Sequence, residues 1–361
     1  MLANFKSYYK KHSKVVMPTA IFGGFALDVI TLNKIDQLFD NAVFIFHIIA
    51  SLIVFTILYS ENTSLGRRLK VSSNKAIYET ILLFSFGALF SGFTIVYFRS
   101  GSIFSSWPFI LTMFFLMVSV EVRKDYFRNK VFQFSIIYLS LFSYLVIFYS
   151  LIFKKIEDWV FVLSGTSSIV FAFIYIFLLR FIDKQKSKIF TFRLQRSATL
   201  IFLVLNIFYF TNIIPPVPLS LKFKAVYHDI QKLADGGYVG TYEVSKGLGI
   251  FRKRSHTVHR AADDSIYVFT EVYAPTRIST DIYHVWQKFE NEKMGWVDID
   301  KIKLSIVGGR DEGYRGYSSK TNLSDGRWRV KVENKRGQIL GYINFKVINN
   351  IEPAYLYGEA L

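Results

Sequence analysis

The sequence predicts a polytopic α-helical membrane domain of about seven spans, followed by a small all-β, Ig-like antiparallel sandwich. Three observations lead to this fold class. Apolar residues form long runs in the first 218 residues, basic residues cluster in alternate connections between the runs, and residues after about 263 alternate with period two. The chain has 361 residues, of which 52% are hydrophobic and 37 are phenylalanine.

Runs of roughly 17 to 25 apolar residues are long enough to cross the hydrocarbon core of a bilayer as helices. We identify seven, at residues 15–32, 43–59, 77–98, 103–120, 132–153, 159–182 and 198–214. A cleaved signal peptide is the alternative for the first run. Asp28 within the run and the lack of a small-residue cleavage site argue against it.

The distribution of charge predicts an orientation. The formal net charge is +17, and residues 1–219 carry 22 basic and 10 acidic side chains. The N-terminus and every second connection hold 17 Lys and Arg residues, whereas the opposite connections hold 4. By the positive-inside rule the rich side is cytoplasmic, so the N-terminus lies in the cytoplasm and the C-terminal part outside it. The basicity is thus an orientation signal, and we expect no nucleic-acid partner.

Three segments follow from these patterns. Residues 1–218 form the transmembrane domain, which ends at Pro215-Pro216-Val217-Pro218 because proline cannot continue a helix. Residues 219–262 are expected to be a juxtamembrane connecting segment, and residues 263–361 the extracytoplasmic sandwich. The chain has no cysteine, so disulfides, thiol catalysis and Cys-ligated metals are excluded.

The clearest hairpin lies near the end of the chain. In "GRWRVKV" (326–332) and "ILGYINFKV" (339–347), apolar and polar residues alternate around the turn "NKRG". Trp328, Val330, Val332, Ile343, Phe345 and Val347 are predicted to face inward, and Arg327, Arg329, Lys331, Tyr342, Asn344 and Lys346 outward.

Several phrases in this region resemble a bacterial domain of unknown function, DUF2914. They are "VFTEVYAP" (268–275), "HVWQKF" (284–289), "GGRDEGYRGYSSK" (308–320) and the hairpin above. The resemblance covers about residues 255–348. It implies a β-sandwich-like module at the C-terminus of a bacterial inner-membrane protein, and it implies no activity or catalytic residue.

Basic and aromatic residues on the outer side of the hairpin are the first candidate site. Arginine forks bind carboxylates and phosphates, and tyrosine faces suit sugar rings. The alternative is a solvated strand face, in which charges protect against aggregation. The candidate residues are Arg310, Arg315, Arg327, Arg329, Lys331, Tyr342 and Lys346, and the expected partners are an anionic envelope glycan or a partner membrane protein.

Polar residues within the apolar runs are the second candidate. Asp28, His47 and Asn206 would lie in the outer half of the bilayer, where they could line a pocket. The alternative is helix–helix packing through polar side chains. Membrane lipids are the expected surroundings in either case.

Other motifs point to structure. The glycine-rich stretch 308–320 has no phosphate-loop pattern and is expected to be a bend between strands. His256, His259 and His284 lack a carboxylate placed with them by motif, and His284 should point inward with Trp286, so we expect structural histidines and no metal. No catalytic motif or cofactor-binding pattern is found.

The sequence therefore favours a non-enzymatic accessory or binding protein of the bacterial inner membrane. The alternative is an enzyme or transporter that acts on a lipid-linked envelope substrate in an outer-leaflet pocket. A sensor would need a partner, because the cytoplasmic connections are short.

Overall fold

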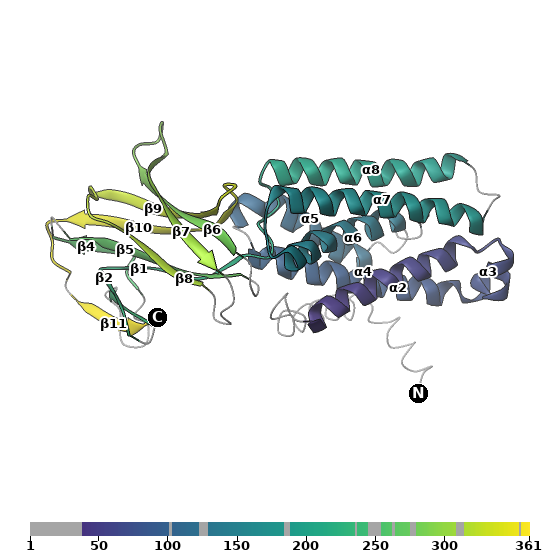
Figure 1. Ribbon diagram of the computed structural model, residues 1–361, viewed down its shortest axis with the longest axis horizontal. Coiled ribbons are helices and arrows are strands. Elements are labelled where there is room, and N and C mark those ends of the chain that lie inside the picture. The colour runs from purple at the N-terminus through teal and green to yellow at the C-terminus, as the bar shows by residue number, and fades with distance from the viewer. Residues whose placement is uncertain are drawn as a thin grey trace. The chain divides into compact units, whose positions relative to one another are not determined.

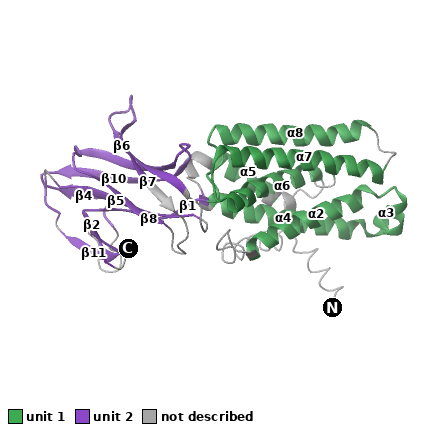
Figure 2. Ribbon diagram, in the orientation of Figure 1, with its two compact units in different colours: residues 1–99, 106–218 green, residues 100–105, 219–361 purple. Residues whose placement is uncertain are grey.

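The computed structural model divides the chain into two compact units, a helical unit of residues 1–99 and 106–218 and a β unit of residues 100–105 and 219–361 (Figure 2). The structure describes residues 38–100, 103–122, 129–183, 188–234, 237–244, 254–261, 264–274, 279–307, 314–353 and 355–361. The first expected span, 15–32, lies outside the described residues.

The described part of the helical unit consists of helices that run antiparallel to their chain neighbours (Figure 1). Their bounds are α2 Leu38–Tyr59, the short α3 Ser64–Arg68, α4 Val71–Ser100, α5 Ile103–Val122, α6 Lys130–Phe153, α7 Asp158–Ile182 and α8 Lys188–Phe210. Helix α6 packs against α2, α7 and α8. Aromatic rings fill the interior, where Phe55, Phe86, Phe90 and Phe142 are fully buried.

Four helices of the described residues are long and apolar enough to cross a membrane. These stretches are Phe39–Tyr59, Val71–Phe98, Lys130–Phe153 and Asp158–Ile182. They correspond to four of the predicted spans, but a total of seven is not supported. Helix α5 contributes only the shorter apolar stretch Trp107–Leu116.

Helix α8 differs from the predicted span 198–214 at both ends. It begins at Lys188 and ends at Phe210. Its first half carries Arg193 and Arg196 in addition to Lys188, so half of the helix is polar. The apolar run on which the prediction rested is only the second half of the helix.

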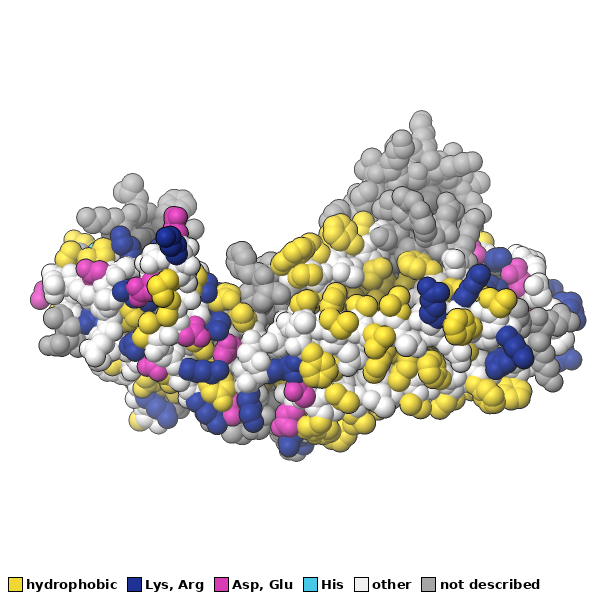
Figure 3. Space-filling view, turned by 90° about the horizontal axis from the view of Figure 1, so that it is seen from above, with side chains coloured by type: hydrophobic (Ala, Val, Ile, Leu, Met, Phe, Trp, Pro, Cys, Tyr) yellow, Lys and Arg dark blue, Asp and Glu magenta, His cyan; other side chains and the backbone are white. Residues whose placement is uncertain are grey.

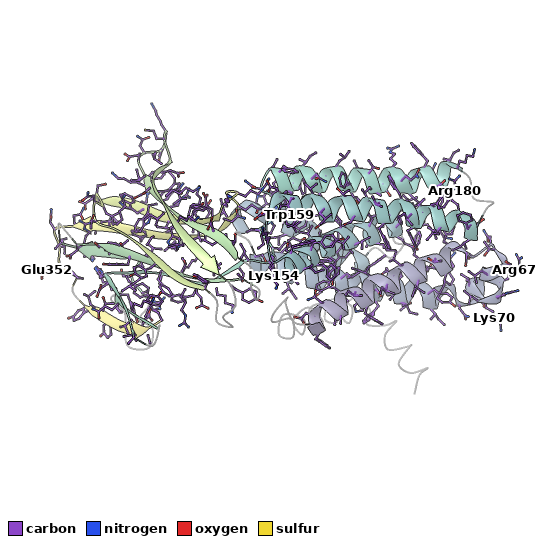
Figure 4. All side chains as sticks on the ribbon, in the orientation of Figure 1. Arg67, Lys70, Lys154, Trp159, Arg180 and Glu352 are labelled. Atoms are coloured by element: carbon purple, nitrogen blue, oxygen red, sulfur yellow. The ribbon has the colours of Figure 1, made fainter. Side chains whose placement is uncertain are left out.

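The surface of the helical unit is apolar along the helices and basic near one end. Phe177, Leu178, Ile189 and other large apolar side chains are exposed, and such side chains spread over the face seen in Figure 3. Arg67, Lys70 and Arg180 lie together at one end of the bundle, whereas Lys154 and Trp159 lie at the other (Figure 4). Arg67 and Lys70, from the connection between α2 and α4, thus lie at the same end of the bundle as Arg180 near the end of α7.

The β unit contains eleven strands in its described residues. Their bounds are β1 Ser220–Tyr227, β2 Asp229–Lys232, β3 Tyr238–Glu243, β4 Thr257–Arg260, β5 Ile266–Tyr273, β6 Ser279–Phe289, β7 Trp296–Val307, β8 Tyr314–Lys320, β9 Gly326–Asn334, β10 Ile339–Asn349 and β11 Leu356–Ala360. They form a five-stranded sheet β4-β10-β9-β6-β7 and two three-stranded sheets, β1-β5-β8 and β11-β3-β2.

The β1-β5-β8 sheet has other strands on both faces, and its central strand β5 is mostly buried. Residues of β5 alternate between the two sides: Thr270 contacts β6 of the five-stranded sheet, whereas Phe269 packs with Tyr227 and Ile230. Tyr238 and Tyr242 of β3 cover this second side. The β unit is therefore built of three layers, more than the single sandwich that we expected.

Residues 219–262 thus differ from the connecting segment that the sequence predicted. They supply β1 to β4, and the boundary between the two units falls at Pro218. Most strand pairs are antiparallel, as predicted, but β4 pairs with β10 in parallel. Residues 314–320 of the glycine-rich stretch form strand β8, and its first part, 308–313, lies outside the described residues.

A buried hydrogen-bond network joins two of the sheets. His284 of β6 is fully buried, with Nε2 at 2.9 Å from Thr270 Oγ1 and Nδ1 at 2.8 Å from Ser318 Oγ. Trp286 Nε1 donates to the same Ser318 oxygen at 3.0 Å. Burial lowers the pKa of His284 to about 3, so the ring is neutral at pH 7. The prediction that His284 and Trp286 point inward is confirmed.

Candidate functional site

The outer face of the five-stranded sheet carries the predicted basic and aromatic residues. Across β9 and β10, Arg327 lies opposite Lys346, Arg329 opposite Asn344, and Lys331 opposite Tyr342. The intervening residues Trp328, Val330, Val332, Ile343, Phe345 and Val347 are buried. The alternation therefore places the predicted outer set on one face. We call Arg327, Arg329, Lys331, Tyr342 and Lys346 the basic face.

Arg329 is held between two aromatic rings. Its guanidinium carbon lies 4.3 Å from the ring centroid of Trp296 and 4.6 Å from that of Tyr342. Its Nε donates to Gln287 Oε1 at 2.5 Å, and Gln287 Nε2 donates in turn to Asp298. Partial burial lowers the pKa of Arg329, although it remains charged at pH 7. The ring faces and the amide fix its position, so Arg329 is a structural part of the face.

Lys331 is engaged with an acidic residue. Its Nζ lies 3.0 Å from Glu333 Oε2, and Lys301 Nζ of β7 lies 2.7 Å from Glu333 Oε1. Lys301 also lies 4.5 Å from the ring centroid of Tyr283. The Glu333 carboxylate is nearly buried beneath these two lysines. Glu333 thus offsets part of the positive charge here, so this part of the face is a weaker attractor for an anion than unpaired cations would be.

Arg327 and Lys346 differ from the rest of the face. They lie directly opposite each other on neighbouring strands, and both are exposed. The Arg327 guanidinium is held 3.8 Å from the ring centroid of Phe289. Within the described part of the chain no carboxylate forms an ion pair with either residue. Like charges placed directly across a strand pair are destabilising, so this pair is suited to an anion that would bridge the two cations.

The remaining members of the predicted face lie elsewhere. Arg315 is on β8, in a different sheet, where it lies opposite Glu271 in the register of β5 and β8. Its Nη1 donates to Leu361 O at 3.1 Å. The sequence grouped Arg315 with the basic face, but β7 and β8 belong to different sheets, so Arg315 lies elsewhere. Arg310 lies outside the described residues.

Two of the three polar residues predicted within the apolar runs, His47 and Asn206, have separate surroundings. His47 of α2 is buried against Phe84 of α4, with ring centroids 5.7 Å apart. Asn206 of α8 donates from Nδ2 to Phe202 O of its own helix at 2.8 Å. No contact between these two side chains occurs in the described residues, and Asp28 lies outside them. Asn206 thus has the local backbone contact typical of a polar residue that packs within a helix.

The three histidines considered for a metal lie at different places. His284 is in the core, whereas His259 Nδ1 lies 2.5 Å from Glu243 Oε1. His256 contributes its main-chain oxygen to Lys346 N at 2.8 Å. Among the described residues no group of three His, Asp or Glu side chains is arranged to hold a metal ion.

Sequence reasoning missed two parts of the β unit. Two partners of the basic face, Gln287 and Phe289, could have been found by extending the alternation of β6 past Trp286, whereas Trp296 reaches the face from the neighbouring strand β7. Arg254, which lies among Phe223, Tyr227 and Tyr242, had no local signal. Its surroundings come from strands that are far apart in the sequence.

The described chain is thus a protein with a set of long apolar helices and a layered β domain that carries a basic, aromatic face. Residues 279–347, which span β6 to most of β10, match the family described as "Protein of unknown function (DUF2914)". This confirms the resemblance noted for the C-terminal part.

Comparison with curated proteins gave no match. Among solved structures, the Pseudomonas fluorescens alkylpurine DNA glycosylase AlkC bound to DNA containing an abasic site analog is similar at 8% identity. The alignment covers 87% of this chain and 99% of that chain with a TM-score of 0.18, which is too low to carry an argument.

Proposed function

We propose that this protein is a non-enzymatic accessory protein of the bacterial inner membrane, which presents its β unit outside the cytoplasm to bind an anionic envelope component. The observation that carries the proposal is the pair Arg327 and Lys346, two exposed cations opposite each other without an acidic partner in the described residues.

The membrane part of the proposal rests on the helical unit. Its four long apolar helices expose large apolar side chains, an arrangement that is costly in water and favourable in lipid. The basic residues Arg67, Lys70 and Arg180 at one end of the bundle support a cytoplasmic position for that end. The opposite end, with Lys154 and Trp159, would then face the exterior.

The binding part rests on geometry and charge. Phe289 fixes the Arg327 guanidinium, so less side-chain entropy is lost when an anion binds. Tyr342 and Trp296 lie beside it on the same face, although Arg329 occupies a face of each ring. A carboxylate or phosphate group of an envelope glycan fits this chemistry best.

The test is a double charge reversal, Arg327→Glu with Lys346→Glu, in the full chain in nanodiscs. The probe is a heparin oligosaccharide, used as a defined anionic glycan and titrated by microscale thermophoresis. The control is Lys303→Glu with Lys288→Glu, which changes the net charge equally but affects lysines that already pair with Asp281 and Glu290.

We expect the test variant to weaken binding about tenfold or more, because each charge-assisted hydrogen bond contributes about 1.5–3 kcal/mol. The control should weaken it about threefold at most, through the general field alone. Equal losses in both variants would show that only net charge matters and would refute a site at Arg327 and Lys346.

A further inference from the structure

A second feature of the β unit is a cage of aromatic rings around the side chain of Arg254. The guanidinium carbon lies 4.7 Å from the ring centroid of Phe223, 5.1 Å from Tyr242 and 5.7 Å from Tyr227. Its Nη2 also donates to Glu359 Oε1 of β11. Three ring faces and one carboxylate thus surround one cation.

The walls of this cage are fixed by contacts that do not involve Arg254. Tyr227 is fully buried and meets Tyr242 edge to face, with ring centroids 6.2 Å apart. Phe269 of β5 packs behind both Phe223 and Tyr227, at centroid distances of 6.2 and 6.3 Å. The cage would therefore keep its shape if the cation were replaced.

Glu359 is held in place by Tyr227. The tyrosine hydroxyl donates to Glu359 Oε1 at 2.5 Å. Burial raises the pKa of Tyr227, and the neighbouring Glu359 carboxylate raises it further, so the phenol keeps its proton and remains a donor. The carboxylate is thus aimed at the cage with or without Arg254.

Arg254 itself is less firmly anchored to the β unit than the walls of the cage are. Its backbone makes an isolated bridge with Val244, outside any named strand, and the next residue, Ser255, donates its N–H to Glu243 O at 2.8 Å. The side chain is 33% exposed. The cage is therefore open to solvent on the side from which Arg254 enters.

We propose that Phe223, Tyr227, Tyr242 and Glu359 form a binding site for an organic cation, and that Arg254 is an internal occupant which competes with an external guanidinium or quaternary ammonium group. Aromatic faces combined with a carboxylate are the usual means by which proteins bind such cations. The site takes cations and is built on β1, β3 and β11, so it is independent of the anion site proposed on β9 and β10.

The competition has a measurable consequence. A ligand that binds only when Arg254 has left the cage shows a reduced apparent affinity. Its apparent Kd equals the intrinsic Kd divided by the fraction of molecules in that open state. Removal of the Arg254 side chain should abolish this reduction. The substitution that deletes a cation is thus expected to create tighter cation binding.

The experiment compares the full chain with Arg254→Ala in a maltoside detergent, which contributes no cation. Tetramethylammonium chloride and guanidinium chloride are titrated separately by calorimetry, at an ionic strength held constant with sodium chloride. The first probe reports a choline-like lipid headgroup and the second an arginine side chain of a partner. Hydrogen–deuterium exchange of β1 and β3 shows whether the cage remains folded.

We expect Arg254→Ala to bind one or both probes at least about tenfold more tightly than the parent chain. Adding Tyr242→Ala should remove most of that gain, because it deletes one wall. If Arg254→Ala binds neither probe, or if Tyr242→Ala changes nothing, the proposal is wrong. Arg254→Gln retains a hydrogen-bond donor for Glu359 and serves as the second variant should alanine unfold the unit.

Discussion

Val170 of α7 and Ile299 of β7 are aliphatic residues exposed to a similar extent, 50% and 44%, but their surroundings are opposite. Val170 belongs to a helix with many exposed apolar side chains, such as Phe171 and Ile174. Ile299 stands between Asp298 and Asp300 on β7, where the other exposed side chains of residues 296–304 are charged. Exposed large apolar side chains are thus frequent among the described residues of the helical unit and fewer among those of the β unit.

The two units also differ in the kind of polar side chain that they bury. Side chains buried in the helical unit include Ser51, Ser140, Ser164 and Ser168. Tyr138 hydroxyl and Ser168 Oγ lie 3.2 Å apart, linking α6 to α7. In the β unit, the buried polar side chains are mostly larger and include Arg260, Glu333, Asn334 and Gln338 as well as His284. Small polar residues between helices are typical of membrane proteins, in which apolar packing alone gives little driving force.

The largest effect that would test this comparison comes from Val170→Asp, matched with Ile299→Asp. If α7 spans a bilayer, a carboxylate near its centre should cost about 2.5–3.5 kcal/mol. The same change on β7 should cost at most about 0.5 kcal/mol, because the site is already solvated. The measurement is the yield of monodisperse protein extracted from membranes. Similar yields for the two variants would contradict a lipid-facing α7.

A smaller effect is expected from the pH dependence of the β unit. The unfolded chain protonates His284 below about pH 6.5, whereas the buried ring resists protonation until about pH 3. Stability is therefore fully present above pH 6.5 and is lost as the pH falls, by about 1.4 kcal/mol per pH unit between these values. Hydrogen–deuterium exchange of the β6 amides from pH 7 to 5, corrected for intrinsic rates, measures this slope.

His284→Gln lowers the stability at neutral pH but should remove that part of the slope, since glutamine does not titrate. His256→Gln is the control, because this histidine is exposed and its loss should leave the slope unchanged. An unchanged slope in His284→Gln would mean that the buried imidazole does not govern the acid sensitivity of the unit.

Local patterns in the sequence were sufficient for some elements. The alternation in 326–347 predicted the inward and outward residues of β9 and β10, because side-chain direction in a strand depends only on the parity of the residue. Apolar runs likewise predicted α2, α4, α6 and α7 as long helices. In both cases the sequence pattern and the helix or strand that it predicts occupy the same local stretch of the chain.

Other features depend on residues that are distant in the sequence. Strand β2 has four residues and gains its place only by pairing with β3, which in turn pairs with β11 more than a hundred residues later. Nothing near Arg254 reveals that Glu359 will reach it. The sequence predicted only which residues of the basic face point outward. In the structure, Gln287 and Trp296 fix Arg329, and Glu333 pairs with Lys331. Only the tertiary structure separates the structural cations from the free pair.

The smallest expected effect concerns a hydrogen bond between helices α2 and α7. Tyr175 hydroxyl lies 2.7 Å from Thr56 Oγ1 and donates to Leu52 O at 2.9 Å, while its ring stacks on Phe134. Tyr175→Phe keeps the ring and removes both polar contacts. The expected loss is about 0.6 kcal/mol, and at most about 1.7, because polar groups in an unfolded membrane chain also find partners.

Tyr149→Phe in α6 is the matched control, since the described residues provide no hydrogen bond to that half-buried hydroxyl. Unfolding of both variants in mixed micelles of increasing denaturing detergent gives the two changes in free energy. The control should differ from the parent chain by no more than the error. A loss at Tyr175 well above 2 kcal/mol would indicate a hydrogen bond without competing partners in the unfolded state. The helical interior would then resemble that of the β unit, where the buried groups Thr270, His284 and Ser318 bond to one another.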